Sequence, residues 1–126
     1  TESNTMLNCV IVGLGGFIGA VLRYLISLIP IKNPDSFPIN TFIINILGAL
    51  IIGIIAFTAA KNQNLDAKLI LFLKVGICGG FTTFSTFSLE TANLIKSGCV
   101  LTAIIYILLS VIFGILAALL PELLAK

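Results

Sequence analysis

Four long apolar segments constrain this chain more than any other feature of its sequence. They run from about Leu7 to Ile29, from Ile39 to Ala60, from about Leu69 past Phe87, and from Cys99 to Leu120. Because a helix rises about 1.5 Å per residue, about 20 residues are enough to cross a hydrocarbon core of roughly 30 Å. Short polar separators join the segments, so consecutive helices must run antiparallel. The sequence therefore predicts one all-α integral membrane domain with four transmembrane helices, covering residues 1–126.

The scarcity of charge excludes most soluble functions. Only 10% of the residues are charged, whereas an average soluble domain carries roughly 25%. The net charge of +2 is too small to indicate a nucleic-acid partner. The chain has no histidine, which excludes histidine-dependent nucleophilic catalysis and histidine metal sites, so no enzymatic activity is expected. The three cysteines lie in apolar runs and are interpreted as small hydrophobic side chains.

The size and the charge distribution of the chain bear on its assembly. Four helices pack around their own side chains without an aqueous hole, so transport by this chain implies an oligomer with a path near a subunit interface. With the N-terminus inside, the cytoplasmic side would hold Lys61, Lys68 and Lys126. The opposite side would hold Lys32 and Lys96. The lysine counts on the two sides are nearly equal, so the sequence leaves two outcomes open. The chain inserts either in a single orientation, or in both orientations with assembly as antiparallel subunits.

Small residues spaced four apart predict places where helices approach closely. Such spacing supports packing but does not identify the helix that packs on each pair. The pairs are Gly15 and Gly19, Gly76 and Gly80, and Gly114 and Ala118.

The third apolar segment contains the string Gly76-Ile77-Cys78-Gly79-Gly80-Phe81-Thr82-Thr83-Phe84-Ser85-Thr86-Phe87-Ser88. Adjacent glycines add backbone freedom, and the hydroxyl side chains that follow compete for backbone hydrogen bonds. We therefore predict a break in the helix between about Gly79 and Thr83, with a kinked but continuous helix as the alternative. Carbonyl groups freed at membrane depth are tolerated where they are buried in protein, line a cavity or hold a cation.

Side chains that can donate weakly to an anion lie just beyond this predicted break. Phe84 and Phe87 share a helix face, and the positive edge of an aromatic ring can meet a weakly hydrated anion. Hydroxyl groups can donate to an anion as well, and the neighbouring ones belong to Thr82, Ser85, Thr86 and Ser88. Ordinary packing of the two rings stays open as the alternative. Such weak donors suit conduction, in which an ion must bind and also leave.

Polar side chains in the other spans could extend this row. Asn45 lies midway along the second span, where its amide can point at an anion or make an interhelical hydrogen bond. Tyr106 and Ser110 are one turn apart in the fourth span and could continue the same polar track. Arg23 can snorkel to the interface or draw anions into a vestibule. Glu90 is interpreted first as a surface or capping residue and second as a gate or proton carrier.

These residues resemble the Fluc (CrcB-type) fluoride channels. The resemblance rests on Gly19-x-x-x-Arg23 in the first span, on Asn45 followed by Gly48 in the second, and above all on the third-span string. It covers nearly the whole chain, including its length and its number of spans. It implies an antiparallel, dual-topology homodimer with two fluoride pathways, which exports cytoplasmic fluoride passively across the inner (plasma) membrane. The expected partners are therefore fluoride, membrane lipid and a second copy of the chain.

The resemblance also implies roles for individual residues. The residues that match the fluoride path by position are Phe84, Phe87, Asn45, Tyr106, Ser110, Thr83, Ser85 and Thr86. Glu90 matches an acidic position near the end of the pore. Gly79 and Thr82 match two residues whose carbonyl groups, from both subunits, hold a central sodium ion.

Two other functions stay open on the residues alone. A small multidrug-type proton-coupled antiporter also has four spans, but it needs a deeply buried carboxylate, for which Glu90 is an imperfect candidate. The other alternative is a non-transporting membrane subunit of a larger complex.

Overall fold

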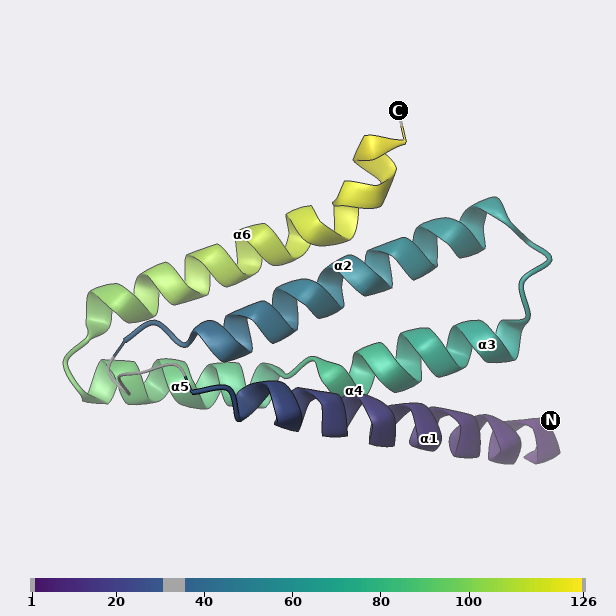
Figure 1. Cartoon of the computed structure of the whole chain (residues 1–126), viewed down its shortest axis with the longest axis horizontal. Helices are drawn as coiled ribbons and strands as arrows, with labels where there is room; N and C mark the ends of the chain where they lie inside the picture. The colour runs from purple at the N-terminus through teal and green to yellow at the C-terminus, as the bar shows by residue number, and fades with distance from the viewer. Residues whose placement is uncertain (1, 31–35, 126) are drawn as a thin grey trace.

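The computed structural model of the chain describes residues 2–30 and 36–125. These residues form helices and no strand, in agreement with the all-α prediction. The helical elements in chain order are α1 (Glu2–Ser27), α2 (Ile39–Lys61), α3 (Ala67–Leu71), η1 (Phe72–Cys78), α4 (Gly79–Phe81), α5 (Phe84–Lys96) and α6 (Val100–Leu124). Figure 1 shows long helices lying side by side, with α3, α4 and α5 following one another along one line and a short non-helical stretch between α4 and α5.

Among the described residues, four helical stretches are long and apolar enough to cross a membrane, which confirms the predicted number of spans. They are Asn4–Ser27, Ile39–Lys61, Ala67–Lys96 and Val100–Leu124. The first helix ends at Ser27, two residues before the predicted limit at Ile29. The last helix passes through Pro121, where the apolar pattern had suggested an end. Membrane helices tolerate such a proline, and α6 bends in its C-terminal part (Figure 1).

Glycines seat α1 directly against the third span. A Cβ atom added to Gly15 would lie 2.8 Å from the Cα atom of Gly76, and one added to Gly80 would lie 2.9 Å from the Cα atom of Gly16. The predicted pairs Gly15/Gly19 and Gly76/Gly80 therefore pack on each other within one chain. The third pair behaves differently, because Ala118 packs on Gly53 of α2, a partner that the spacing did not indicate.

This close packing predicts that Gly19→Ala destabilises the protein. A Cβ atom there would lie 2.8 Å from the backbone nitrogen of Phe81 and would also collide with the carbonyl oxygen of Ile77. Overpacking costs about 1–3 kcal/mol, and backbone atoms cannot rotate away. We expect a lower melting temperature in detergent, measured by size-exclusion chromatography after heating. Gly13→Ala is the matched control, because open space surrounds Gly13 and its variant should melt no lower than the wild type.

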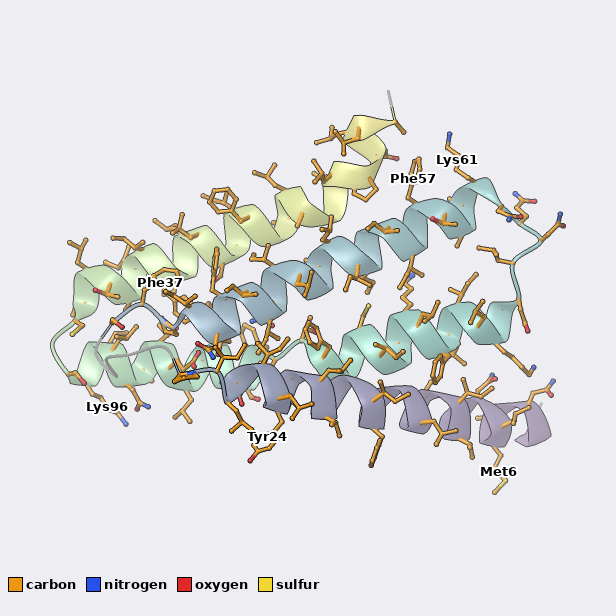
Figure 2. The ribbon with its side chains drawn as sticks, viewed as in Figure 1. Met6, Tyr24, Phe37, Phe57, Lys61 and Lys96 are labelled. Carbon is orange, nitrogen blue, oxygen red and sulfur yellow. The ribbon has the colours of Figure 1, made fainter. Side chains whose placement is uncertain are left out.

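Few side chains are buried within one chain. Between 11 and 17% of the residues in the most apolar stretch of each span are buried. The fully buried large side chains are Tyr106 and Ile44. Met6 and Tyr24 point away from the neighbouring helices, as Figure 2 shows, and both are exposed. Most of the apolar surface must therefore meet lipid or another protein surface.

The third span is broken, as predicted, and the alternative of a continuous helix is wrong. The helix stops at Phe81, and the backbone is extended at Thr82 (φ −82°, ψ 156°) and at Thr83 (φ −147°, ψ 116°). The helix resumes at Phe84, where the Thr83 hydroxyl accepts a hydrogen bond from the backbone N–H of Thr86 at 3.1 Å. The break thus lies at the hydroxyl residues, while Gly79 is still helical. The π-helical turns of η1 before it were not predicted.

Candidate functional site

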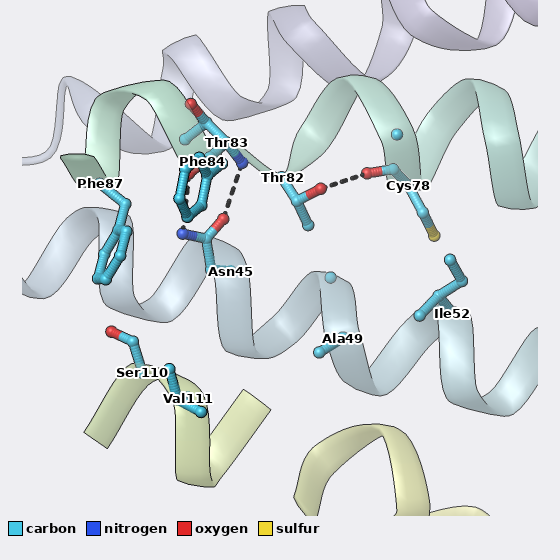
Figure 3. A pocket seen from close by; sticks show the side chains of 12 residues that line it. Asn45, Ala49, Ile52, Cys78, Thr82, Thr83, Phe84, Phe87, Ser110 and Val111 are labelled. Carbon is cyan, nitrogen blue, oxygen red and sulfur yellow. Dashed lines mark hydrogen bonds between the residues drawn. The ribbon is translucent and has the colours of Figure 1, made fainter. Parts of the chain in front are cut away.

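A pocket of about 410 Å³ opens beside the break in the third span. It lies between α2, the two parts of the third span, and α6 (Figure 3). Several predicted site residues line it together, namely Asn45, Gly79, Thr82, Thr83, Phe84, Phe87 and Ser110. None of the described residues that line it carries a charge.

Asn45 of α2 pairs with the backbone of Thr83 in both directions. Its Oδ1 atom accepts from the Thr83 N–H at 2.8 Å, and its Nδ2 atom donates to the Thr83 carbonyl at 3.1 Å (Figure 3). The interhelical hydrogen bond that the sequence left open is therefore present. An amide nitrogen carries two hydrogens, so the pairing uses one donor and leaves a second beside the pocket. Asn45 consequently holds the break in place and still lines the pocket.

The two phenylalanines lie next to each other at the start of α5. Their ring centroids are 5.8 Å apart with an interplanar angle of 43°. Phe84 is 79% exposed, so its ring is available to a partner or a ligand. Phe87 is half-buried, and its ring lies 4.9 Å from that of Tyr106. Phe87 therefore packs within the subunit, whereas Phe84 has few packing contacts within one chain.

Ser110 of α6 faces the same pocket from the opposite side (Figure 3). Its hydroxyl oxygen is buried and has no hydrogen-bond partner among the described residues. Buried polar groups in native proteins are nearly always satisfied. The Ser110 hydroxyl therefore indicates a place for a polar ligand, a water molecule or an ion.

Glu90 is half-buried in the middle of α5 and hydrogen-bonded to side chains of two other helices, so the capping role is wrong. Its Oε2 atom accepts from the hydroxyl of Thr41, and its Oε1 atom accepts from the hydroxyl of Tyr106, each at 2.8 Å. Tyr106 is fully buried. The hydroxyl of Tyr106 is therefore bound to Glu90, and it does not line the first pocket beside Ser110. The expected continuous track of Tyr106 and Ser110 is divided between two environments.

A second pocket, of about 550 Å³, lies at the end of the molecule where α1 stops and α2 begins. Its polar lining residues are Ser27, Ser36, Asn40, Thr41, Thr86, Glu90 and Asn93. Thr86 and Glu90 thus belong to this pocket, while Phe87, next to Thr86, belongs to the first. Ser85 is exposed and lies 3.4 Å, oxygen to oxygen, from the hydroxyl of Thr83. Helix α5 therefore runs past both pockets.

The break frees carbonyl groups of the kind that can bind a cation. In a continuous helix the Thr83 N–H would donate to the Gly79 carbonyl, but it donates to Asn45. Gly79 and Thr82 both line the first pocket, and open space surrounds Gly79. The described residues contain no cluster of three acidic, cysteine or histidine side chains that could hold a metal. The Gly79 carbonyl has lost its helical donor beside the pocket.

Arg23 and Asn40 make contacts that sequence reasoning missed. The Nε atom of Arg23 donates to the Gly80 carbonyl at 3.1 Å. The Nδ2 atom of Asn40 donates to the carbonyls of Ile26 at 2.9 Å and Ile29 at 3.0 Å, which satisfies backbone groups at the end of α1. The only sequence signal for the contact of Asn40 with the end of α1 was the presence of a polar residue at the start of α2.

These features define a multi-pass helical membrane protein with an uncharged polar pocket at a broken helix. A model of the CrcB-like proteins, described as Camphor Resistance (CrcB), matches residues 10–121. The chain belongs to this family.

Curated relatives match most of the chain. A fluoride-specific ion channel FluC of Ruminiclostridium cellulolyticum is 48% identical over 122 residues, which are 96% of this chain and 94% of the relative. A protein of the same name from Azobacteroides pseudotrichonymphae is 44% identical over 117 residues, covering 92% of this chain and 94% of the relative. Another from Clostridium novyi is 50% identical over 97 residues, 76% of each chain.

Proposed function

We propose that this protein is a fluoride channel, through which cytoplasmic fluoride leaves passively down its electrochemical gradient. The observation that carries the proposal is the pocket beside the broken helix, whose lining includes two phenylalanine rings, hydroxyl groups and one amide. The relatives named as fluoride-specific channels support the same ion. The absence of charge among the described lining residues suits conduction, because a fixed cation would hold the anion too firmly to release it.

Three kinds of weak donor meet the ion along the proposed path. The edges of Phe84 and Phe87 carry partial positive charge. The hydroxyl of Ser110, buried without a partner among the described residues, and the second amide hydrogen of Asn45 face the same space. Thr83 and its neighbouring hydroxyl residues, Ser85 and Thr86, extend the row along α5. In a site shielded from water, such donors replace part of the hydration shell of the anion.

The working unit of the proposal is a homodimer of two antiparallel subunits with two fluoride pathways. The pocket is open on one side, and the 79% exposure of Phe84 leaves a ring at its edge for a second subunit to cover. The nearly even distribution of lysines over the two faces supports insertion in both orientations. The remaining exposed apolar side chains meet membrane lipid, and the inner (plasma) membrane is the proposed location.

A central sodium ion belongs to the same proposal. The carbonyl groups of Gly79 and Thr82 from both subunits would hold it, because the break releases these groups next to the pocket. Bound there, the cation would neutralise carbonyl charge at membrane depth and join the two broken helices.

A proton-coupled antiporter is the competing function, and it would depend on Glu90. Both carboxylate oxygens of Glu90 accept hydrogen bonds from other side chains, and Glu90 lines the second pocket rather than the first. We therefore expect fluoride to leave proteoliposomes without an imposed pH gradient, once valinomycin allows potassium to balance the charge. Fluoride-electrode recordings test this expectation. Efflux that requires a pH gradient and fails in Glu90→Gln would favour the antiporter.

A further inference from the structure

The break in the third span leaves carbonyl groups without their helical donors. In a continuous helix the Gly80 carbonyl would accept from the N–H of Phe84, four residues later. The helix ends at Phe81, and Phe84 begins the next one. The Gly80 carbonyl accepts instead from the Nε atom of Arg23, at 3.1 Å and across 57 residues of sequence. Arg23 thus supplies a donor that the backbone has lost.

Close packing of α1 brings Arg23 to this carbonyl. Gly19 lies one turn before Arg23 on α1, and a Cβ atom on Gly19 would lie 3.1 Å from the carbonyl carbon of Gly80. On the other helix, a Cβ atom on Gly80 would lie 2.9 Å from the Cα atom of Gly16. The two backbones therefore touch just before the break. Arg23 is only partly exposed, which restricts its side chain further.

We propose that Arg23 is a positioning residue that caps the first half of the broken helix. A cationic donor is favourable at the carbonyl end of a helix, where the backbone carries partial negative charge. By holding the Gly80 carbonyl on the side of α1, Arg23 fixes the adjoining peptide units of Gly79 and Thr82, which line the pocket. Arg23 does not line that pocket itself, so it acts on the ion path through the backbone.

This role differs from the vestibule role predicted from the sequence, in which the charge of Arg23 attracts anions. Three substitutions separate the two roles, because they differ at the atom four bonds from Cα. Glutamine places an amide nitrogen there and keeps a donor without the charge. Lysine places a methylene there and keeps the charge without that donor. Methionine fills the space with a methyl group and keeps neither.

The effect on ion flow rests on the proposed fluoride channel. We expect Arg23→Gln to keep at least about half of the wild-type fluoride efflux rate, and Arg23→Met and Arg23→Lys to lose about tenfold, the scale expected when a partly buried carbonyl loses its donor. A purely electrostatic role would give the reverse order, with Lys active and Gln impaired. That reverse order would overturn the proposal.

A spectroscopic measurement tests the cap without relying on fluoride. Glycine followed by phenylalanine occurs at Gly16–Phe17 and Gly80–Phe81 and nowhere else in the chain. Carbon-13 in glycine carbonyls and nitrogen-15 in phenylalanine therefore produce two coupled signals in solid-state NMR, and Gly16 serves as the internal reference. We expect the Gly80 carbonyl signal to shift upfield in Arg23→Met and Arg23→Lys and to stay near its wild-type position in Arg23→Gln.

The NMR measurement and the efflux measurement test different claims. An unshifted Gly80 signal in Arg23→Met would overturn the cap, whatever the efflux rates are. Wild-type protein that carries no fluoride would contradict the proposed function, while the Gly80 signal would still decide whether Arg23 caps the helix.

Discussion

Replacing Asn45 with aspartate is expected to reduce fluoride efflux from proteoliposomes by at least about 100-fold. The side chain of Asn45 both accepts from and donates to the backbone of Thr83, and a carboxylate cannot donate. The new negative charge would also lie in a pocket whose described lining is uncharged. At about 4 Å and an effective dielectric constant of about 20, this charge would repel an anion by about 4 kcal/mol. That energy is more than a decrease of about 100-fold in efflux rate requires.

Two further variants isolate the cause of this loss. Asn64→Asp makes the same chemical change in the exposed turn between α2 and α3, and it should leave efflux unchanged. Asn45→Ala removes the pairing with Thr83 without adding charge, so we expect an intermediate loss of about tenfold from the unpaired backbone groups. A folded Asn45→Asp protein with the wild-type efflux rate would show that Asn45 is not part of the pathway.

Replacing Phe84 with isoleucine is expected to reduce fluoride efflux by at least about tenfold while leaving the protein folded. The substitution keeps an apolar side chain at the pocket but removes the aromatic ring with its positive edge. Because Phe84 is 79% exposed within one chain, it contributes little to the core of the subunit. Initial rates from a fluoride electrode, normalised to reconstituted protein, measure the effect.

Phe17→Ile is the matched control for this substitution. Phe17 is also strongly exposed, at 70%, but it lies on α1 outside the lining of the pocket. Its variant should conduct at the wild-type rate. Equal rates for the wild type and a monodisperse Phe84→Ile protein would show that the ring edge plays no part in conduction.

The spans could be predicted from the sequence because hydrocarbon requires long apolar helices, and little else satisfies the backbone there. The break was predictable for a related reason. Glycines and hydroxyl residues together weaken a helix, although they did not show whether the chain turns at Gly79 or at Thr82. The π-helical turns of η1 left no signal, because their sequence is as apolar as that of its neighbours.

The partners of the polar residues could not be predicted, because they depend on how distant helices meet. Asn45 pairs with Thr83 across 38 residues, and Arg23 reaches Gly80 across 57. The polar sequence around Glu90 resembled a helix surface, yet Thr41 and Tyr106 from two other helices donate to its carboxylate. Single-sequence reasoning therefore identified most of the residues that line the first pocket and missed the contacts that hold them.

The central claim is that an uncharged pocket beside the broken helix conducts fluoride selectively. The most direct test compares the initial fluoride and chloride efflux rates of the purified wild-type protein in the same proteoliposomes, with potassium as the counter-ion through valinomycin. We predict rapid fluoride efflux and chloride efflux no greater than from protein-free liposomes. Equal rates for the two anions, or fluoride efflux at the protein-free level, would contradict the claim.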